Sequence, residues 1–319
     1  MLKRIYLKKI MVATLALFAL VMLYLMPSNT NDHELSTDKV EYVYNNKSEV
    51  IYLLDSNDYV ARTVIAGCDC DSKEEARDVI EGLTIDGKKS HIIPNGFRSI
   101  LPVGTSILGL ELKDKLLTIN FSSELLDINS KYEEKMIEAI IYTLTSIDGI
   151  DKITIKVDGE VLKKLPNSGK SIPEVLDKSF GVNKKYDIVN TSNIDSYTVY
   201  YVSSFNDNEY YVPVTKYVNS KGDDKVKVII DELSSSPIHE TNLMSYLNTN
   251  VSLINYDLSD DILKLNFSNS ILDNSTSNKI LEEVVYTISL SVQDNYNIKE
   301  VDFLVEDKEI YKNSLKSLE

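Results

Sequence analysis

Length, composition and charge narrow the classes of protein to which this chain can belong. Its 319 residues include 34 basic and 49 acidic side chains, for a formal charge of −15 at pH 7, and only two Cys. This length suits about two domains of roughly 150 residues, each large enough to bury its own core. A disulfide scaffold and general disorder are therefore excluded. Nucleic-acid binding is also disfavoured, because an acidic body repels the phosphate backbone.

The amino terminus has the pattern of a membrane anchor. The basic tail at residues 1–9 precedes an uncharged apolar run from Ile10 to Met26. As a helix this run would span roughly 25 Å, the short end of a membrane crossing. The positive charges are expected to keep the tail in the cytoplasm and to place everything after the juxtamembrane linker, residues 27–40, outside it. A cleaved signal peptide is the alternative, but bulky residues at 23–26 stand where a cleavage site needs small ones.

The rest of the chain is a duplication. Leu110–Asp127 matches Tyr256–Asp273 without a gap, at an offset of 146 residues. Further matches join residues 59–63 to 211–215 and residues 141–144 to 285–288. A period of this size indicates two tandem domains rather than a solenoid of short repeats. We expect domains at residues 41–165 and 196–310, a connector at 166–195 with a short helix over 172–180, and a C-terminal tail at 311–319.

The first half of each copy predicts a strand pair followed by a helix. Alternating apolar residues indicate the strands, and apolar residues at i, i+3, i+4 and i+7 indicate the helix. Pro213 confines its strand to an edge or a bulge, because proline cannot donate to a ladder. The strands are expected at 50–54 and 59–65 and at 198–202 and 210–217, and the helices carry Ala76, Val79, Ile80 and Leu83, and Val226, Ile229, Ile230 and Leu233.

The second half of each copy predicts a hairpin, a helix and a closing strand. Leu108, Leu110 and Leu112 alternate on one face of the first hairpin strand, as do Ile254, Tyr256 and Leu258 in copy two. The second helix is expected to carry an apolar stripe from Met136 to Ile147, matched by Ile280 to Ile288, and the closing strands lie at 153–157 and 301–305. Each domain is therefore expected to be an α+β unit of order ββαββαβ, with both helices on one face of a mixed sheet.

Few residues suggest chemistry. Cys68 and Cys70 form a lone C-x-C, and a bridge across one residue would be strained. The pair is interpreted as two unpaired or adventitiously oxidised loop thiols rather than a redox or metal site, because no second knuckle or His ligand is near. His33, His91 and His239 are interpreted as solvated loop residues. The carboxylate pairs Glu133–Glu134 and Asp260–Asp261 are assigned to a helix start and a turn, although paired carboxylates can also hydrolyse glycosides. We expect no catalytic residues, no cofactor and no metal.

Tyrosine is the stronger functional signal. Tyr197, Tyr200, Tyr210, Tyr211 and Tyr217 cluster on the opening strands of copy two. Packing within a sheet accounts for such a cluster, and the alternative is a protein-interaction surface, because Tyr provides a large contact area at low entropy cost.

The order of these motifs resembles the GerMN domains of sporulation and spore germination proteins. The resemblance lies in the Val-Pro-Val-Thr strand at 212–215, the hairpins that end in Asn-Phe-Ser at 120–122 and 266–268, the Tyr-Thr-Leu helix at 142–144 and the Asp-Gly turn at 158–159. It covers roughly residues 40 to 310 and occurs twice behind one apolar segment. Proteins of this family are often lipoproteins, whereas this chain has no Cys at the end of its apolar segment, so the helix itself would have to be the tether.

The resemblance implies a fold and a role. The fold would be related to the ring-building motifs of secretion systems. The role would be that of a non-enzymatic protein in the mother-cell membrane of an endospore former, facing the intermembrane space around the forespore. It would help to build or stabilise the channel complex that joins the two cells, with other sporulation envelope proteins as partners and self-association into rings. The alternative is a peptidoglycan-binding or cortex-modifying protein of spore maturation or germination.

Overall fold

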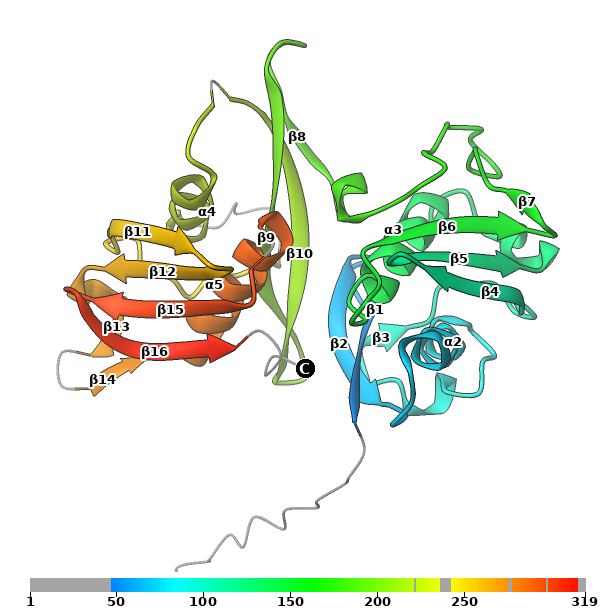
Figure 1. The fold of residues 1–319 in the computed structure, drawn as a ribbon, viewed down its shortest axis with the longest axis horizontal. Coiled ribbons are helices and arrows are strands. Elements are labelled where there is room, and N and C mark those ends of the chain that lie inside the picture. The colour runs from blue at the N-terminus through cyan, green and yellow to red at the C-terminus, as the bar shows by residue number, and fades with distance from the viewer. Residues whose placement is uncertain (1–46, 221, 236–241, 275–276, 297, 315–319) are drawn as a thin grey trace, which may run out of the picture. The chain divides into compact units, whose positions relative to one another are not determined.

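The computed structural model describes residues 47–220, 222–235, 242–274, 277–296 and 298–314 (Figure 1). Among these residues, no helix combines the length and the apolar character that crossing a bilayer requires. The predicted anchor, Ile10–Met26, lies outside the described residues, as do the basic tail and the juxtamembrane linker.

The first repeat follows the predicted order of its main elements. Strands β1 and β2 form an antiparallel hairpin and precede helix α2, which begins after Asp71, whose carboxylate accepts hydrogen bonds from the backbone N–H groups of Lys73 and Glu74. The β4–β5 hairpin, helix α3 and strand β6 follow. Short strands β3 and β7 were not predicted. The bounds are β1 Ser48–Asp55, β2 Val60–Ala66, α2 Ser72–Leu83, β3 Phe97–Arg98, β4 Ile107–Lys113, β5 Leu116–Phe121, α3 Glu133–Leu144, β6 Lys152–Val157 and β7 Glu160–Val161.

The second repeat has the same order with longer opening strands. Its closing strand β15 pairs with an additional strand, β16, which extends to Ser314, so the repeat runs beyond residue 310, where a tail was expected. The bounds are β9 Ile194–Phe205, β10 Asn208–Asn219, α4 Lys225–Ser234, β11 Leu253–Ser259, β12 Ile262–Phe267, β13 Leu272–Asn274, β14 Ser277–Ile280, α5 Glu282–Asn295, β15 Glu300–Val305 and β16 Lys308–Ser314.

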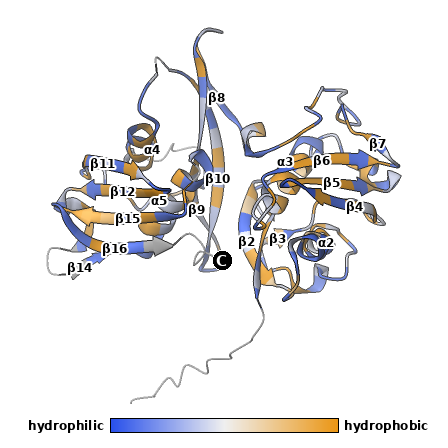
Figure 2. Ribbon diagram, viewed as in Figure 1, coloured by the Kyte–Doolittle hydropathy of each residue, from blue (hydrophilic) through white to orange (hydrophobic). Residues whose placement is uncertain are grey.

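The strands of each repeat belong to more than one sheet, two in repeat one and three in repeat two, which corrects the expectation of one sheet with helices on one face. In repeat one, β4, β5, β6 and β7 form a four-stranded sheet, and the β1–β2 hairpin belongs to another. Helix α3 contacts β1 and β2 as well as β6, and almost all of its side chains are buried. A helix that is buried on all sides needs apolar residues around its circumference, not in one stripe. Figure 2 shows the matching concentration of hydrophobic residues on β5, β6 and α3.

The opening hairpins of the two repeats join in one six-stranded sheet. Its strand order is β3-β1-β2-β10-β8, with β9 on the other side of β10. Strands β2 and β10 pair antiparallel through Arg62 and Tyr211. On one side, β10 pairs with β9 along its whole length. On its other side, β10 pairs with β2 at Tyr211 and with β8 at residues 216–218. Pro213 lies between these two contacts, where β10 has a strand neighbour only on the β9 side. The predicted edge position of Pro213 is therefore confirmed locally, in a strand that is otherwise interior.

Two hydrogen bonds show which residues of the repeats are equivalent. The Tyr52 N–H donates to Thr143 Oγ1, and the Tyr200 N–H donates to Ser291 Oγ, both at 2.9 Å. Both members of the second pair follow those of the first by 148 residues, since 200 − 52 and 291 − 143 are equal. The predicted alignment of the second helices, 144 residues apart, is therefore wrong by one helical turn. Ile280 instead ends β14, and Leu281 precedes the first residue of α5.

The connector is part of the packed structure. Leu165, Ile172, Leu176 and Val182 are buried, and Leu176 exchanges two backbone hydrogen bonds with Ile153 of β6. The helix predicted over 172–180 is limited to a 3₁₀ turn at Lys178–Phe180, and strand β8 at Lys185–Asp187 pairs with β10. The segment thus crosses from the sheet of repeat one to the shared sheet.

Candidate functional site

A buried polar cluster joins the two repeats. The Tyr52 and Tyr200 hydroxyls lie 2.8 Å apart, and Tyr200 donates to Asp294 Oδ2 at 2.6 Å. The Lys178 ammonium donates to the other carboxylate oxygen of Asp294 at 2.6 Å. Tyr52 belongs to β1, Lys178 to the connector, Tyr200 to β9 and Asp294 to α5. The cluster therefore links four elements through one buried carboxylate.

Burial and the Asp294 charge set the ionisation of this cluster. Burial raises the pKa of Tyr52 and Tyr200, and the nearby Asp294 carboxylate raises both further. Burial alone would lower the pKa of Lys178, but the attraction of Asp294, the nearby Tyr52 and the hydrogen bond to Asp294 together raise it, so this pKa lies above its usual value. Neutral phenols and a charged Lys–Asp pair are therefore the stable forms, which suits a structural lock and leaves no group poised for proton transfer near neutral pH.

The tyrosine cluster predicted as an interaction surface is mostly interior. Tyr197, Tyr200 and Tyr210 are buried, and Tyr211 and Tyr217 are half-buried. Tyr210 donates to Asp55 and packs edge-on against the Phe97 ring, both in repeat one. These contacts correct the hypothesis of an exposed recognition patch, because part of the cluster binds the other repeat of the same chain.

Asn183 is a second link between the repeats, and no pattern in the sequence predicts it. Its side-chain amide donates to the carbonyls of Val60 and Pro213, and its oxygen accepts from the Val60 N–H. It thereby satisfies backbone groups of β2 and β10 where these strands do not pair with each other. Its φ of 44° lies in the left-handed region, which Asn tolerates better than most residues.

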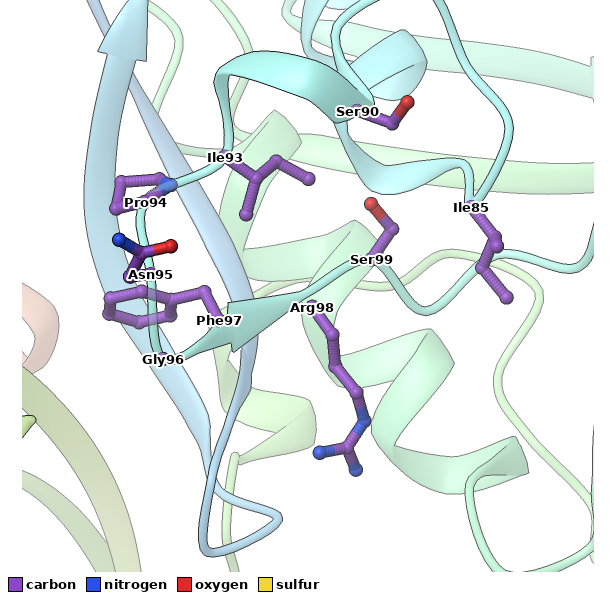
Figure 3. A pocket seen from close by; sticks show the side chains of 9 residues that line it. All are labelled: Ile85, Ser90, Ile93, Pro94, Asn95, Gly96, Phe97, Arg98 and Ser99. Carbon is purple, nitrogen blue, oxygen red and sulfur yellow. The ribbon is translucent and has the colours of Figure 1, made fainter.

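Two adjoining hollows in repeat one share Ile85, Arg98 and Ser99. Figure 3 shows the smaller, of about 390 Å³, where Ile85 and Ile93 stand on opposite sides of Ser90 and Ser99. The larger, of about 500 Å³, has an apolar wall that includes Val103, which is 60% exposed. Among the described residues, the lining of the smaller hollow includes no carboxylate, His or Cys. Its two serines therefore have no carboxylate or His in the lining to act as a general base.

The Asp58 carboxylate lies near these hollows, and cationic side chains contact it. Its carboxylate accepts hydrogen bonds from Lys131, Arg98 and Tyr132. The bonds from Lys131 and Arg98 lower the pKa of Asp58 to about 2. This carboxylate is held as an anion and is not a proton donor.

The carboxylate pairs considered for chemistry have structural roles. Glu133 is buried and accepts hydrogen bonds from the backbone N–H groups of Asn167 and Ser168. Glu134 pairs with Lys170 and Lys184. Asp260 and Asp261 form the two-residue turn between β11 and β12, both with positive φ. His91 lies exposed in a 3₁₀ turn, while His33 and His239 lie outside the described residues.

Cys68 and Cys70 are joined in a disulfide, which is the oxidised one of the two forms that the sequence left open. Their sulfur atoms and a Glu49 carboxylate oxygen lie within 4.8 Å of one another, which is close enough for three ligands of one metal ion. However, Glu49 already accepts hydrogen bonds from the Cys68 N–H and from Lys89. Metal ligation by cysteine requires thiolates, which a disulfide does not provide. The donor set therefore does not fit a metal in this oxidised form.

Both repeats expose an aliphatic residue at a bulge in an edge strand. Strands β4 and β11 are the edges of their four-stranded sheets, and each pairing register shifts by one residue, at Leu108 and at Ile254. These β-bulges turn Leu108 and Ile254 out of the predicted core-facing alternation and leave them 55% and 52% exposed. Leu108 and Ile254 are 146 residues apart, which is the offset of the matching hairpins, so the duplication preserves this feature.

Comparison with known proteins identifies relatives over most of the chain. A relative in Bacillus subtilis (strain 168), the spore germination protein GerM, is 29% identical over 283 residues, which cover 88% of this chain and 77% of the relative. The solved structure of the tandem GerMN domains of the sporulation protein GerM from Bacillus subtilis has a TM-score of 0.75 and 30% identity. The match covers 82% of this chain and 92% of the chain in that structure.

The family assignment follows from the extent of the match. The two stretches that fit the family model correspond to the two repeats and leave out the connector. Because the Germane family, described as sporulation and spore germination, matches residues 42–163 and 198–311, this chain belongs to that family and consists of two tandem GerMN domains.

Proposed function

We propose that this chain is a non-enzymatic, membrane-anchored assembly protein that acts outside the cytoplasm during sporulation. Residues 10–26 would anchor it in the mother-cell membrane, and its two repeats would help to build or stabilise the channel complex between mother cell and forespore. Family membership supports a role in sporulation or germination. The catalytic candidates have structural partners, which is consistent with a binding role.

One observation carries the proposal of protein binding: the repeated, exposed Leu108 and Ile254 at edge-strand bulges. Edge strands have free backbone groups that can pair with another chain, and bulges discourage unspecific pairing. An exposed aliphatic side chain beside such groups suits a specific partner that adds a strand and covers the side chain. Two such sites in one chain would let it bridge two partner subunits.

The test is made in sporulating cells of the source organism with the full-length chain. Leu108→Ser and Ile254→Ser are combined, and Val189→Ser serves as the matched control, because Val189 is 89% exposed but lies in the connector. Co-isolation after cross-linking is scored for channel proteins that carry ring-building motifs, and spores are counted. We expect the double variant to lose both the channel proteins and spore yield while the control retains them. Equal recovery from the double variant and the wild type would reject the proposal.

Two further measurements address the alternative and the anchor. Co-sedimentation with purified peptidoglycan and release of muropeptides test the cortex-related role, and activity that is lost on changing Glu133 or Asp260 to Ala would favour it. Protease digestion of intact protoplasts tests the orientation. We expect the repeats to be digested from outside, and their protection would contradict an extracytoplasmic location.

A further inference from the structure

A hollow of about 420 Å³ in repeat one is lined by cations in a protein that is otherwise acidic. Its wall includes five Lys side chains against two carboxylates, whereas the whole chain carries −15. The cations come from the start of α3, from the connector and from β8, so they are scattered between residues 131 and 185. The fold thus gathers positive charge at this hollow, although the net charge of the whole chain is negative.

Three of the lysines are already paired. The Lys184 ammonium lies 2.6 Å from Glu134 Oε1 and 3.5 Å from Glu138 Oε1, and its side chain is only 9% exposed. Lys170 lies 3.0 Å from Glu134, and Lys131 pairs with Asp58 outside the hollow. Both carboxylates in the wall are therefore neutralised within it, and they hold Lys184 in place.

The remaining two lysines lack a carboxylate partner. Among the described residues, no ion pair includes Lys135 or Lys185. The Lys135 ammonium lies 3.4 Å from Asn183 Oδ1 and 5.9 Å from the centre of the Tyr59 ring. Burial lowers the pKa of Lys135, although Glu138, Asp58 and Asp55 act in the opposite direction at longer range. A partly buried ammonium group that has only an amide and a ring as neighbours is stabilised by an added anion.

The shape and chemistry of the wall favour a compact anion with an organic group attached. Lysine ammonium groups are common phosphate ligands that act as point charges, and five of them line this hollow. Tyr186, which is 59% exposed, stacks on Tyr217 with a centroid distance of 4.9 Å and offers an apolar face next to the lysines. A long polyanion is disfavoured because the acidic body would repel it.

We propose that this hollow binds the phosphate group of a small phosphorylated molecule, with Lys135 and Lys185 as the binding cations and Tyr59 and Tyr186 as the flanking rings. The site lies where the connector leaves repeat one and β8 joins β10 of repeat two. A ligand there fastens the connector to α3. It therefore stabilises the folded chain by an amount that grows with the logarithm of the ligand concentration above the Kd.

The test measures binding to the full-length chain in neutral detergent by calorimetry and by the shift in melting temperature. Inorganic phosphate and glycerol 3-phosphate represent free phosphate and a phosphomonoester, glycerophosphoglycerol represents a lipid headgroup, and chloride at equal ionic strength is the control. We expect inorganic phosphate and glycerol 3-phosphate to bind and to raise the melting temperature, with glycerophosphoglycerol at least about tenfold weaker. Binding of glycerophosphoglycerol alone, or an equal effect of chloride, would overturn the proposal.

Variants assign the binding to this hollow. Lys135→Gln and Lys185→Gln are each expected to weaken phosphate binding about tenfold, because a charge-assisted hydrogen bond is lost. Lys152→Gln, at an exposed lysine of β6, is the matched control and should bind as the wild type does. If Lys135→Gln folds, as judged by its circular dichroism, and binds phosphate like the control, the site is not in this hollow. If Lys135→Gln does not fold, Lys185→Gln decides by the same criterion.

Discussion

Tyr52 and Tyr200 occupy equivalent positions in the two repeats and meet each other, with their hydroxyl oxygens 2.8 Å apart. Each also makes the same backbone contact, since its N–H donates to a side-chain hydroxyl on the second helix of its repeat, Thr143 of α3 or Ser291 of α5. Contact between equivalent residues is the mark of an isologous interface, here between two copies in one chain. The duplication has therefore produced an internal dimer as well as two domains.

The two hydroxyls of this pair are expected to differ in their contribution to stability. Tyr200 donates to Asp294, so Tyr52 must be the donor in the bond between the phenols. Tyr200→Phe removes two buried hydrogen bonds, one of them to a carboxylate, and should lower the free energy of unfolding by about 2–3 kcal/mol. Tyr52→Phe removes one and should cost about 1 kcal/mol. Urea denaturation of the two variants checks the order, and an equal or reversed order would contradict this donor assignment.

Stability is expected to fall at alkaline pH. Burial raises the pKa of Tyr52 and Tyr200 above the ordinary 10.0, and Asp294 raises the pKa of Lys178 above 10.5. A group whose pKa is higher in the folded state stabilises it below the unfolded value and loses that contribution as pH rises towards the folded value. The free energy of unfolding should therefore be level from pH 7 to 9 and fall above about pH 10.

Urea denaturation between pH 7 and 11 measures this loss. The slope should approach about 1.4 kcal/mol per pH unit for each buried phenol that ionises only on unfolding. Tyr200→Phe should have a shallower slope than the wild type, and Tyr186→Phe, at a phenol that is 59% exposed, is the control. A free energy that stays constant up to pH 11 would show that these phenols are not buried as described.

The duplication and the order of the main elements could be predicted from the sequence, but the pairing of the second helices could not. A helix repeats every 3.6 residues, so a shift of four residues keeps nearly the same face inward. Residues 141–144 resemble residues 285–288 in amino-acid type, but the two segments do not occupy equivalent positions in the folded repeats. The hydrogen bonds of Thr143 and Ser291 with backbone N–H groups reveal the true offset. Apolar periodicity does not contain that information.

The features proposed to bind ligands and partners were also beyond sequence reasoning. The period-2 alternation continues through Leu108 and Ile254, so nothing local reveals the bulges that expose them. The junction of the hairpins rests on one ladder pair, Arg62 with Tyr211. The five lysines of the cationic hollow are dispersed along 55 residues, from 131 to 185, of an acidic chain, and only the fold gathers them.

Asn183 is expected to be among the most sensitive polar positions. Asn183→Ala removes three hydrogen bonds to Val60 and Pro213 and places a Cβ-bearing residue without a polar group at φ 44°. The loss should be at least about 3 kcal/mol of unfolding free energy. Asn183→Gly loses the same bonds but tolerates the left-handed backbone, so it should be about 1 kcal/mol more stable than the Ala variant. Chemical denaturation of both tests this, and a Gly variant no better than Ala would contradict the backbone part of the explanation.

The bulge at Leu108 gives a direct test of the hairpin register. If Leu108 followed the alternation it would face the core, as Leu117 of β5 does with no exposed surface. With the bulge, Leu108 is 55% exposed, and Leu108→Ala should change the free energy of unfolding by less than about 1 kcal/mol. Leu117→Ala, by contrast, should cost about 2–5 kcal/mol, because it leaves a cavity. Ile254→Ala paired with Leu263→Ala repeats the comparison in the second copy, where Leu263 is fully buried. Similar losses within either pair would mean that the edge strand keeps its alternation in solution, and the exposed aliphatic side chains would then be unavailable to a partner.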